Sequence, residues 1–116
     1  MKENAILEKS KKFAVKVIIL YQFLTNEKKE FVMSKQLLSS GTSIGANVRE
    51  AHNSISKAEF RAKMNIALKE ASESEYWLEL LHETSYIDEK QFESIYEKCN
   101  ELNKLLIAII KSLNNT

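Results

Sequence analysis

The sequence predicts an all-α fold, an up-down-up-down bundle of four helices, on three observations. The chain has no proline and only two glycines among its 116 residues, so little interrupts long helices and little forms the tight turns of a β-rich protein. Apolar residues recur at alternating steps of three and four along four segments. Ser56 and Asp88 each open a capping box between segments. The length suits one domain over residues 1–116 with its own core.

The first two helices are expected over about residues 3–24 and 35–52. Apolar side chains mark one face of the first helix, and they are Ile6, Phe13, Val17, Leu20 and Leu24. A polar connector over residues 26–30 follows it. We expect Ser34 to be the N-cap of the second helix, because a serine hydroxyl accepts a hydrogen bond from a first-turn N–H.

The third helix is expected over about residues 57–83. In its capping box the Ser56 hydroxyl and the Glu59 carboxylate each satisfy a backbone N–H, and Ile55 against Phe60 forms the hydrophobic staple. Its predicted core stripe comprises Phe60, Met64, Ala67, Ala71, Ser74, Leu78 and Leu81.

The fourth helix is expected over about residues 89–113. Asp88 is its N-cap, Gln91 the third helical residue, and Ile87 packs against Phe92. Its predicted core stripe comprises Phe92, Ile95, Cys99, Leu102, Leu106, Ile109 and Leu113. Such stripes are typical of helices that pack side by side, and the short connections make neighbouring helices antiparallel.

The first and fourth helices are apolar on more sides than one bundle core requires. Val15, Ile18 and Ile19 lie among the core positions of the first helix, and residues 105–110 are all apolar. A helix that is apolar all round must be covered all round. We therefore predict a homo-oligomer, and the alternative is a monomer with exposed aliphatic side chains.

Residues 39–51 are almost all small or polar, although their neighbours indicate a helix. Gly41 and Gly45 lie one turn apart, and each costs about 1 kcal/mol relative to alanine in a helix. Glycine at these two positions is explained if the backbone of another helix approaches that face closely. We interpret the segment as a close-packing element through which identical copies associate.

The second helix also carries a polar stripe, composed of Gln36, Ser40, Ser43, Asn47, Glu50 and Ser54. A buried carboxylate is tolerated only when it is paired or hydrogen-bonded. We interpret the stripe as an interhelical hydrogen-bond network that fixes register and assembly. The alternative is the lining of a ligand site or channel.

The composition argues against catalysis, cofactors and membrane insertion. The chain has two histidines, one cysteine and no glycine-rich phosphate loop, and only Glu79 with His82 has the spacing of half a di-iron site. We therefore expect no catalytic residue, no metal and no cofactor. The lone Cys99 lies in an apolar stripe, which indicates a buried thiol in a reducing compartment. No apolar run is long enough for a membrane span, so we expect a cytoplasmic protein.

Four blocks of the sequence form one ordered set, and they are Ser43–Ala51, Ser56–Phe60, Ile66–Ala71 and Glu75–Leu81. In residues and in order, this set resembles the proteins encoded in intervening sequences of 23S rRNA genes. The resemblance is close over the second and third helices and rests on pattern alone over the first and fourth. Ala51 stands where a glycine often follows the glutamate, a change that fits the Arg-Glu-Ala subgroup.

The resemblance implies a cytoplasmic four-helix bundle that assembles into a ring, a homopentamer, with no established enzymatic activity. It also implies that Asn47 and Glu50 face Glu73 of the third helix, which extends the polar stripe. A related branch comprises accessory proteins of diversity-generating retroelements, similar five-membered barrels that bind nucleic acid and a reverse transcriptase.

The net charge of +1 is unevenly distributed, since residues 1–69 carry thirteen basic against six acidic residues, and residues 70–101 carry ten acidic residues against two lysines. Such polarity attracts a polyanion or guides subunits together. The candidate nucleic-acid-binding residues are Lys9, Lys12, Lys16, Arg49, Lys57 and Arg61. We expect RNA or DNA as a partner, bound through backbone phosphates. The alternative is a protein-assembly scaffold that docks a protein partner.

Overall fold

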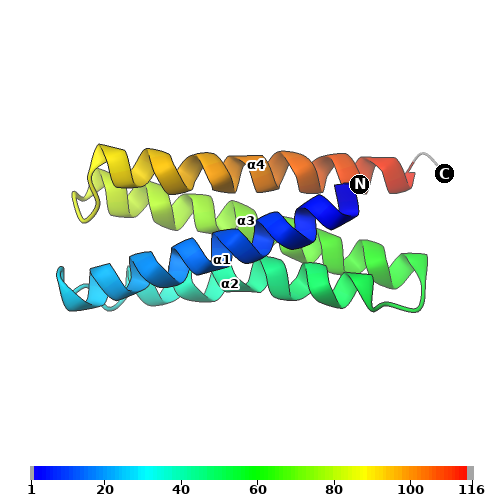
Figure 1. The fold of residues 1–116 in the computed structure, drawn as a ribbon, viewed down its shortest axis with the longest axis horizontal. Helices are drawn as coiled ribbons and strands as arrows, with labels where there is room; N and C mark the ends of the chain where they lie inside the picture. Colours follow the sequence, from blue (N-terminus) through cyan, green and yellow to red (C-terminus); the bar gives the residue numbers. More distant parts are fainter. Residues whose placement is uncertain (1, 115–116) are drawn as a thin grey trace.

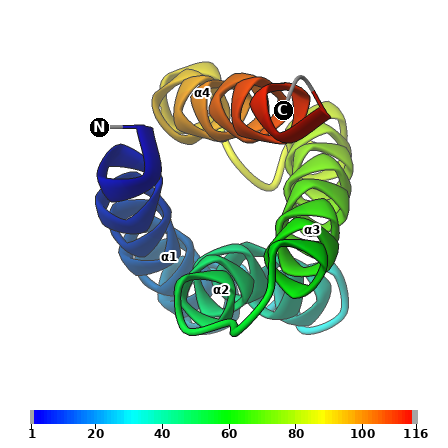
Figure 2. The same cartoon turned by 90° about the vertical axis from the view of Figure 1, so that its right-hand side faces the viewer.

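The computed structural model describes residues 2–114, with side chains from Asn4 onward. It contains four helices, α1 (Lys2–Asn26), α2 (Met33–His52), α3 (Lys57–Glu83) and α4 (Glu89–Asn114) (Figure 1). Viewed end on, the helices form a ring in chain order, with each helix beside the previous and the next (Figure 2). The all-α prediction and the four-helix bundle are confirmed, and each helix lies within two residues of its expected bounds at either end.

The core lies along the axis of this ring, where the four apolar stripes meet. All five residues of the predicted α1 face are buried, and so are the central residues of the α3 and α4 stripes. Phe60, Phe92 and Leu113, at the ends of their stripes, are only partly buried. Each fully buried Leu, Ile or Phe contributes about 1.5–3 kcal/mol relative to an exposed one, so these stripes are the main source of stability.

The turn before α2 differs from the prediction. Ser34 is not the N-cap, because α2 begins earlier, at Met33, and the Val32 side chain makes no capping bond. The buried Glu30 carboxylate caps the helix instead, since it accepts hydrogen bonds from the N–H groups of Val32, Met33 and Ser34 at 3.1, 3.0 and 2.7 Å. The Ser34 hydroxyl donates to the Glu30 carbonyl at 2.7 Å. Lys29 turns the chain with a φ of 55°.

The predicted capping box before α4 is present, whereas only the Ser56 half of the box before α3 is formed. Ser56 Oγ accepts from the Glu59 N–H at 3.1 Å, while Ile55 is 96% exposed, so the predicted staple with Phe60 is wrong. The turn at the end of α2 directs Ile55 into solvent. At α4, the Gln91 N–H donates to Asp88 Oδ1 at 2.8 Å and the Asp88 N–H donates to Gln91 Oε1 at 2.9 Å.

Gly41 and Gly45 lie where α2 crosses α1. A Cβ at Gly41 would stand 2.7 and 2.9 Å from the two methyl carbons of Val17, and one at Gly45 would stand 3.5 Å from the Ser10 backbone. The predicted close approach of a second helix is therefore confirmed. At both glycines the neighbouring helix is α1 of the same chain, so the close packing is explained without a contact between identical copies.

Candidate nucleic-acid interface

Three of the six predicted basic residues converge on one groove between α1 and α4. Lys9, Lys12 and Lys16 lie on successive turns of α1. The groove measures about 320 Å³, and its lining comprises Ala5, Glu8, Lys9, Lys12, Phe13, Lys16, Lys98 and Glu101. Lys98 comes from α4 and was missed in the sequence, because it lies in the acidic segment and only the fold brings it opposite the α1 lysines.

Two carboxylates partly neutralise this groove. Lys9 Nζ lies 3.0 Å from Glu101 Oε2, and Lys12 Nζ lies 3.1 Å from Glu8 Oε1. The hydrogen bond from Lys9 lowers the pKa of Glu101. Exposed ion pairs of this kind contribute only about 0–1 kcal/mol, so a phosphate can compete for both lysines. Among the residues that the structure describes, Lys16 and Lys98 form no ion pair.

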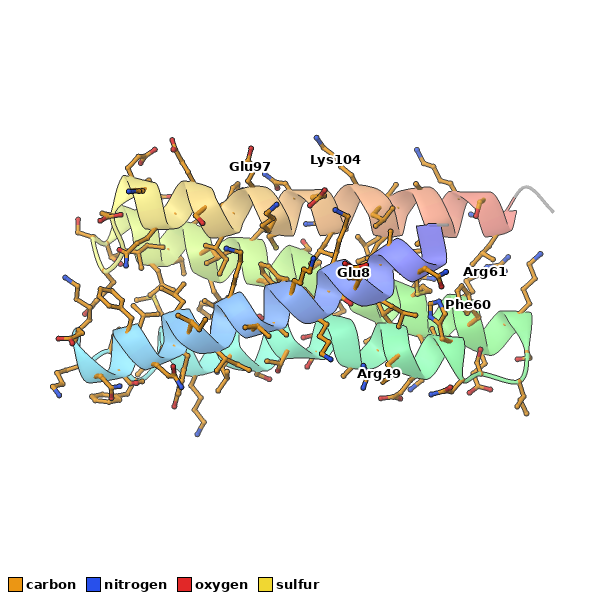
Figure 3. The ribbon with its side chains drawn as sticks, in the orientation of Figure 1. Glu8, Arg49, Phe60, Arg61, Glu97 and Lys104 are labelled. Atoms are coloured by element: carbon orange, nitrogen blue, oxygen red, sulfur yellow. The ribbon has the colours of Figure 1, made fainter. Side chains whose placement is uncertain are left out.

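The other three predicted basic residues lie elsewhere, so the six do not form one track. Arg49 lines a different groove, of about 520 Å³, between α1 and α2. Figure 3 places it on the opposite edge of the bundle from Glu97 and Lys104. Arg61 has a structural contact, since its Nη2 donates to the Leu113 carbonyl of α4 at 3.2 Å. Lys57 is exposed at the start of α3.

A second groove continues from the first along α1 and α4, and the two share Lys16. It measures about 380 Å³, and its lining comprises Lys16, Ile19, Leu20, Phe23, Gln91, Ser94 and Ile95. Most of these side chains are apolar. Lys28 Nζ stands 5.9 Å from the centre of the Phe23 ring, within the range of a cation–π contact.

The predicted polar network of Ser43, Asn47, Glu50 and Glu73 is not formed. The Ser43 hydroxyl and the Asn47 amide donate to carbonyls one turn earlier in α2, at 2.7 and 2.8 Å. Glu50 is exposed and pairs with Lys63 at 2.8 Å, and Glu73 accepts from the Trp77 indole N–H at 3.3 Å. Each of these side chains is bonded within its own helix or to the adjacent helix. None of them is hydrogen-bonded to another member of the predicted network.

The buried polar link between α2 and α3 is a hydroxyl pair. Ser74 Oγ donates to Ser40 Oγ at 2.9 Å, and Ser40 is the only member of the predicted stripe that is buried in the described part of the chain. A repeat of polar residues predicts which side chains share a face. It does not distinguish the member that points at a neighbouring helix from those that point to solvent.

Groups suited to catalysis or metal binding are not gathered anywhere in residues 2–114. No three His, Cys, Asp or Glu side chains in that range lie close enough together to hold a metal ion. Cys99 is a buried thiol, as predicted, and its Sγ donates to the Ala71 carbonyl at 3.3 Å. Burial raises the pKa of this thiol, which disfavours the reactive thiolate. Over the described residues, no helix is both long and apolar enough to cross a bilayer.

Comparison with known proteins supports the resemblance found in the sequence. A solved structure of a protein with unknown function from the S23 ribosomal protein family of Bacteroides thetaiotaomicron is 62% identical, with a TM-score of 0.94. The match covers 96% of this chain and 99% of that chain. No curated protein matches the chain. The family model described as 23S rRNA-intervening sequence protein matches residues 2–108. The chain therefore belongs to the family of 23S rRNA-intervening sequence proteins.

Proposed function

We propose that this protein is a non-enzymatic, cytoplasmic helical bundle that associates with RNA or DNA through backbone phosphates. The observation that carries the proposal is the convergence of Lys9, Lys12, Lys16 and Lys98 on the α1–α4 groove. Phosphate contacts need only positive charge within reach, and they dominate the affinity of proteins for nucleic acid. Lys16 and Lys98 form no ion pair within the described residues, so each can bind a phosphate without first breaking an ion pair.

We further propose that copies of the chain associate into a homo-oligomeric ring, a pentamer by resemblance to the family. The outward side chain of Val15 on α1 is 49% exposed, and those of Ile66 and Tyr76 on α3 are 42% and 53% exposed. A ring covers such apolar surface and repeats the lysine groove around its circumference. Repetition strengthens phosphate binding because several weak sites then act on one polyanion.

The alternative is a scaffold or adaptor that binds a protein partner and no nucleic acid. The observation that favours it is the pairing of Lys9 with Glu101 and of Lys12 with Glu8 inside the groove. These carboxylates repel phosphate, whereas a protein partner can supply side chains of both signs to match them.

Fluorescence anisotropy with labelled RNA and DNA separates the two functions. We expect binding at about 50 mM salt, and four phosphate contacts, one for each lysine of the groove, predict a loss of affinity of about 50- to 150-fold between 50 and 200 mM salt. A protein that binds neither nucleic acid at about 50 mM salt is not a nucleic-acid binder, and the adaptor function then stands.

A pair of charge-reversal variants locates the site. Lys12→Glu combined with Lys16→Glu should weaken binding and reduce its salt dependence, because two phosphate contacts are removed. Lys35→Glu combined with Lys69→Glu is the matched control, since both side chains are exposed on α2 and α3 and neither lines the groove. Equal losses in the two variants would mean that the lysine groove is not the site.

A further inference from the structure

The α1–α4 groove has two chemically different halves that meet at Lys16. One half carries Lys9, Lys12 and Lys98, and the other is floored by Leu20 and Ile95. The apolar half exists because α1 starts close to α4 and then leans away from it toward α2, as both views of the ribbon show (Figures 1 and 2). The side chains of α1 beyond Lys16 and those at the start of α4 therefore leave an open apolar trough.

Phe23 lines this trough close to two positive charges. Lys16 lines the same groove, and Lys28 Nζ stands over the Phe23 ring at 5.9 Å from its centre. Phe13, the aromatic residue between the lysines of α1 before Lys16, is 1% exposed and belongs to the core. The fold brings an aromatic ring into line with them, because Phe23 follows Lys16 by two turns along the same helix edge.

Proteins that bind single-stranded nucleic acid combine these same features. A positive groove follows the backbone, and an apolar or aromatic surface receives unstacked bases. In a duplex the bases are already stacked between the two strands. A duplex can therefore contact the lysines with its phosphates but cannot place a base in the trough. Lys9 and Phe23 are fourteen residues apart on α1, which corresponds to about 21 Å of helix. That length matches about six nucleotides of a stacked strand.

We propose that the α1–α4 groove binds single-stranded nucleic acid in preference to duplex, with phosphates on the lysine half and a base in the trough against Phe23. The proposal deepens the proposed function and rests on it. At the rim of the trough, the Gln91 side-chain oxygen accepts the Asp88 N–H. The amide NH₂ of Gln91 is therefore the group available to donate to a base, and the Ser94 hydroxyl lies on the same rim.

The test compares a labelled 12-nucleotide single strand with the duplex of the same sequence at about 50 mM salt. Phe23→Leu keeps an apolar side chain but removes the aromatic face. It should weaken single-strand binding about five- to tenfold and leave duplex binding unchanged. Ile19→Asp places a negative charge in the trough at a residue that is 60% exposed, so the fold tolerates it, and it should have the same selective effect.

Ile18→Asp is the matched control for charge on the same helix, because Ile18 is 41% exposed and does not line the trough. Circular dichroism checks that each variant is folded, and if Phe23→Leu unfolds, Ile19→Asp decides. Duplex binding as tight as single-strand binding, or both trough variants binding the single strand like the control, overturns the single-strand inference while phosphate binding stands. Failure of the unaltered protein to bind either probe overturns both.

Discussion

Glu30 is a buried carboxylate whose charge is satisfied by the backbone of the next helix. Burial by itself raises the pKa of this carboxyl, but the hydrogen bonds from Met33, Ser34 and Val32 outweigh it and lower the pKa of Glu30 below its ordinary value of 4.5. A group whose pKa is lower in the folded protein stabilises the fold at pH values above its unfolded pKa. That stabilisation is lost as the pH falls through the folded pKa.

Glu30→Gln should therefore lower the free energy of unfolding at pH 7 by about 1 kcal/mol, because it removes a charged helix cap. The difference from the unaltered protein should shrink as the pH falls from 4.5 through the lower folded pKa, below which the carboxyl is protonated in the folded protein as well. Urea denaturation at pH 7 and at about pH 2.5 measures both values. Glu27→Gln, an exposed change in the same turn, is the control and should have no effect. A deficit that is the same at both pH values would contradict the capping role.

The two glycines of α2 should respond differently to the same substitution. Gly41→Ala places a methyl group 2.7 Å from a Val17 methyl carbon, so it should destabilise the protein by about 1–3 kcal/mol despite better helix propensity. Gly45→Ala meets its nearest atoms at 3.4–3.5 Å, an ordinary contact, and should stabilise by up to about 1 kcal/mol. Urea denaturation of both variants checks the contrast. Equal effects would mean that the approach of α1 to Gly41 is not as close as described.

Local patterns predicted the need for contact at single residues but not the identity of the partner. Glycines inside a helix indicate a close neighbour because they are otherwise costly, and that neighbour is present at Gly41. The same pattern is equally compatible with a helix of another copy and with α1, and only the crossing of α1 over α2 decides. Ser34 has the right residue type for an N-cap, but the carboxylate of Glu30 reaches the same N–H groups from the preceding turn.

At the scale of helices, the two capping boxes have the same sequence form and different packing. Ile87 precedes α4 and is 2% exposed, whereas Ile55 precedes α3 and is 96% exposed. Ile87→Ala should therefore cost about 2–5 kcal/mol, because it removes buried methyl groups and leaves a cavity. Ile55→Ala should stay within about 0.5 kcal/mol of the unaltered protein. Thermal denaturation of the two variants compares matched positions, and a large loss for Ile55→Ala would restore the predicted staple.

At the scale of the whole molecule, the sequence predicted the bundle far better than the groove. In each helix the spacing of the apolar residues marks the face that packs in the core. Ile6, Val17 and Leu78 could therefore be assigned to the core without knowledge of the other helices. The groove depends on the tilt of α1 against α4, which no local pattern records. Lys98 becomes a neighbour of the predicted lysines only through the packing of α4 on α1, and Phe23 lines an open trough only because of that tilt.

The exposed aliphatic face of α1 gives the last prediction, which concerns assembly. Val15 is 49% exposed in one copy, and a second copy packed on α1 would bury it. The native mass at micromolar concentration should be several times the 13.4 kDa of one chain. Val15→Asp should reduce that mass without reducing helix content, because a charge at a covered apolar position opposes association. Ile55→Asp is the control, since Ile55 lies at the tip of the bundle between α2 and α3. Light scattering and circular dichroism make the comparison, and a mass of 13.4 kDa for the unaltered protein would mean that these side chains remain in water.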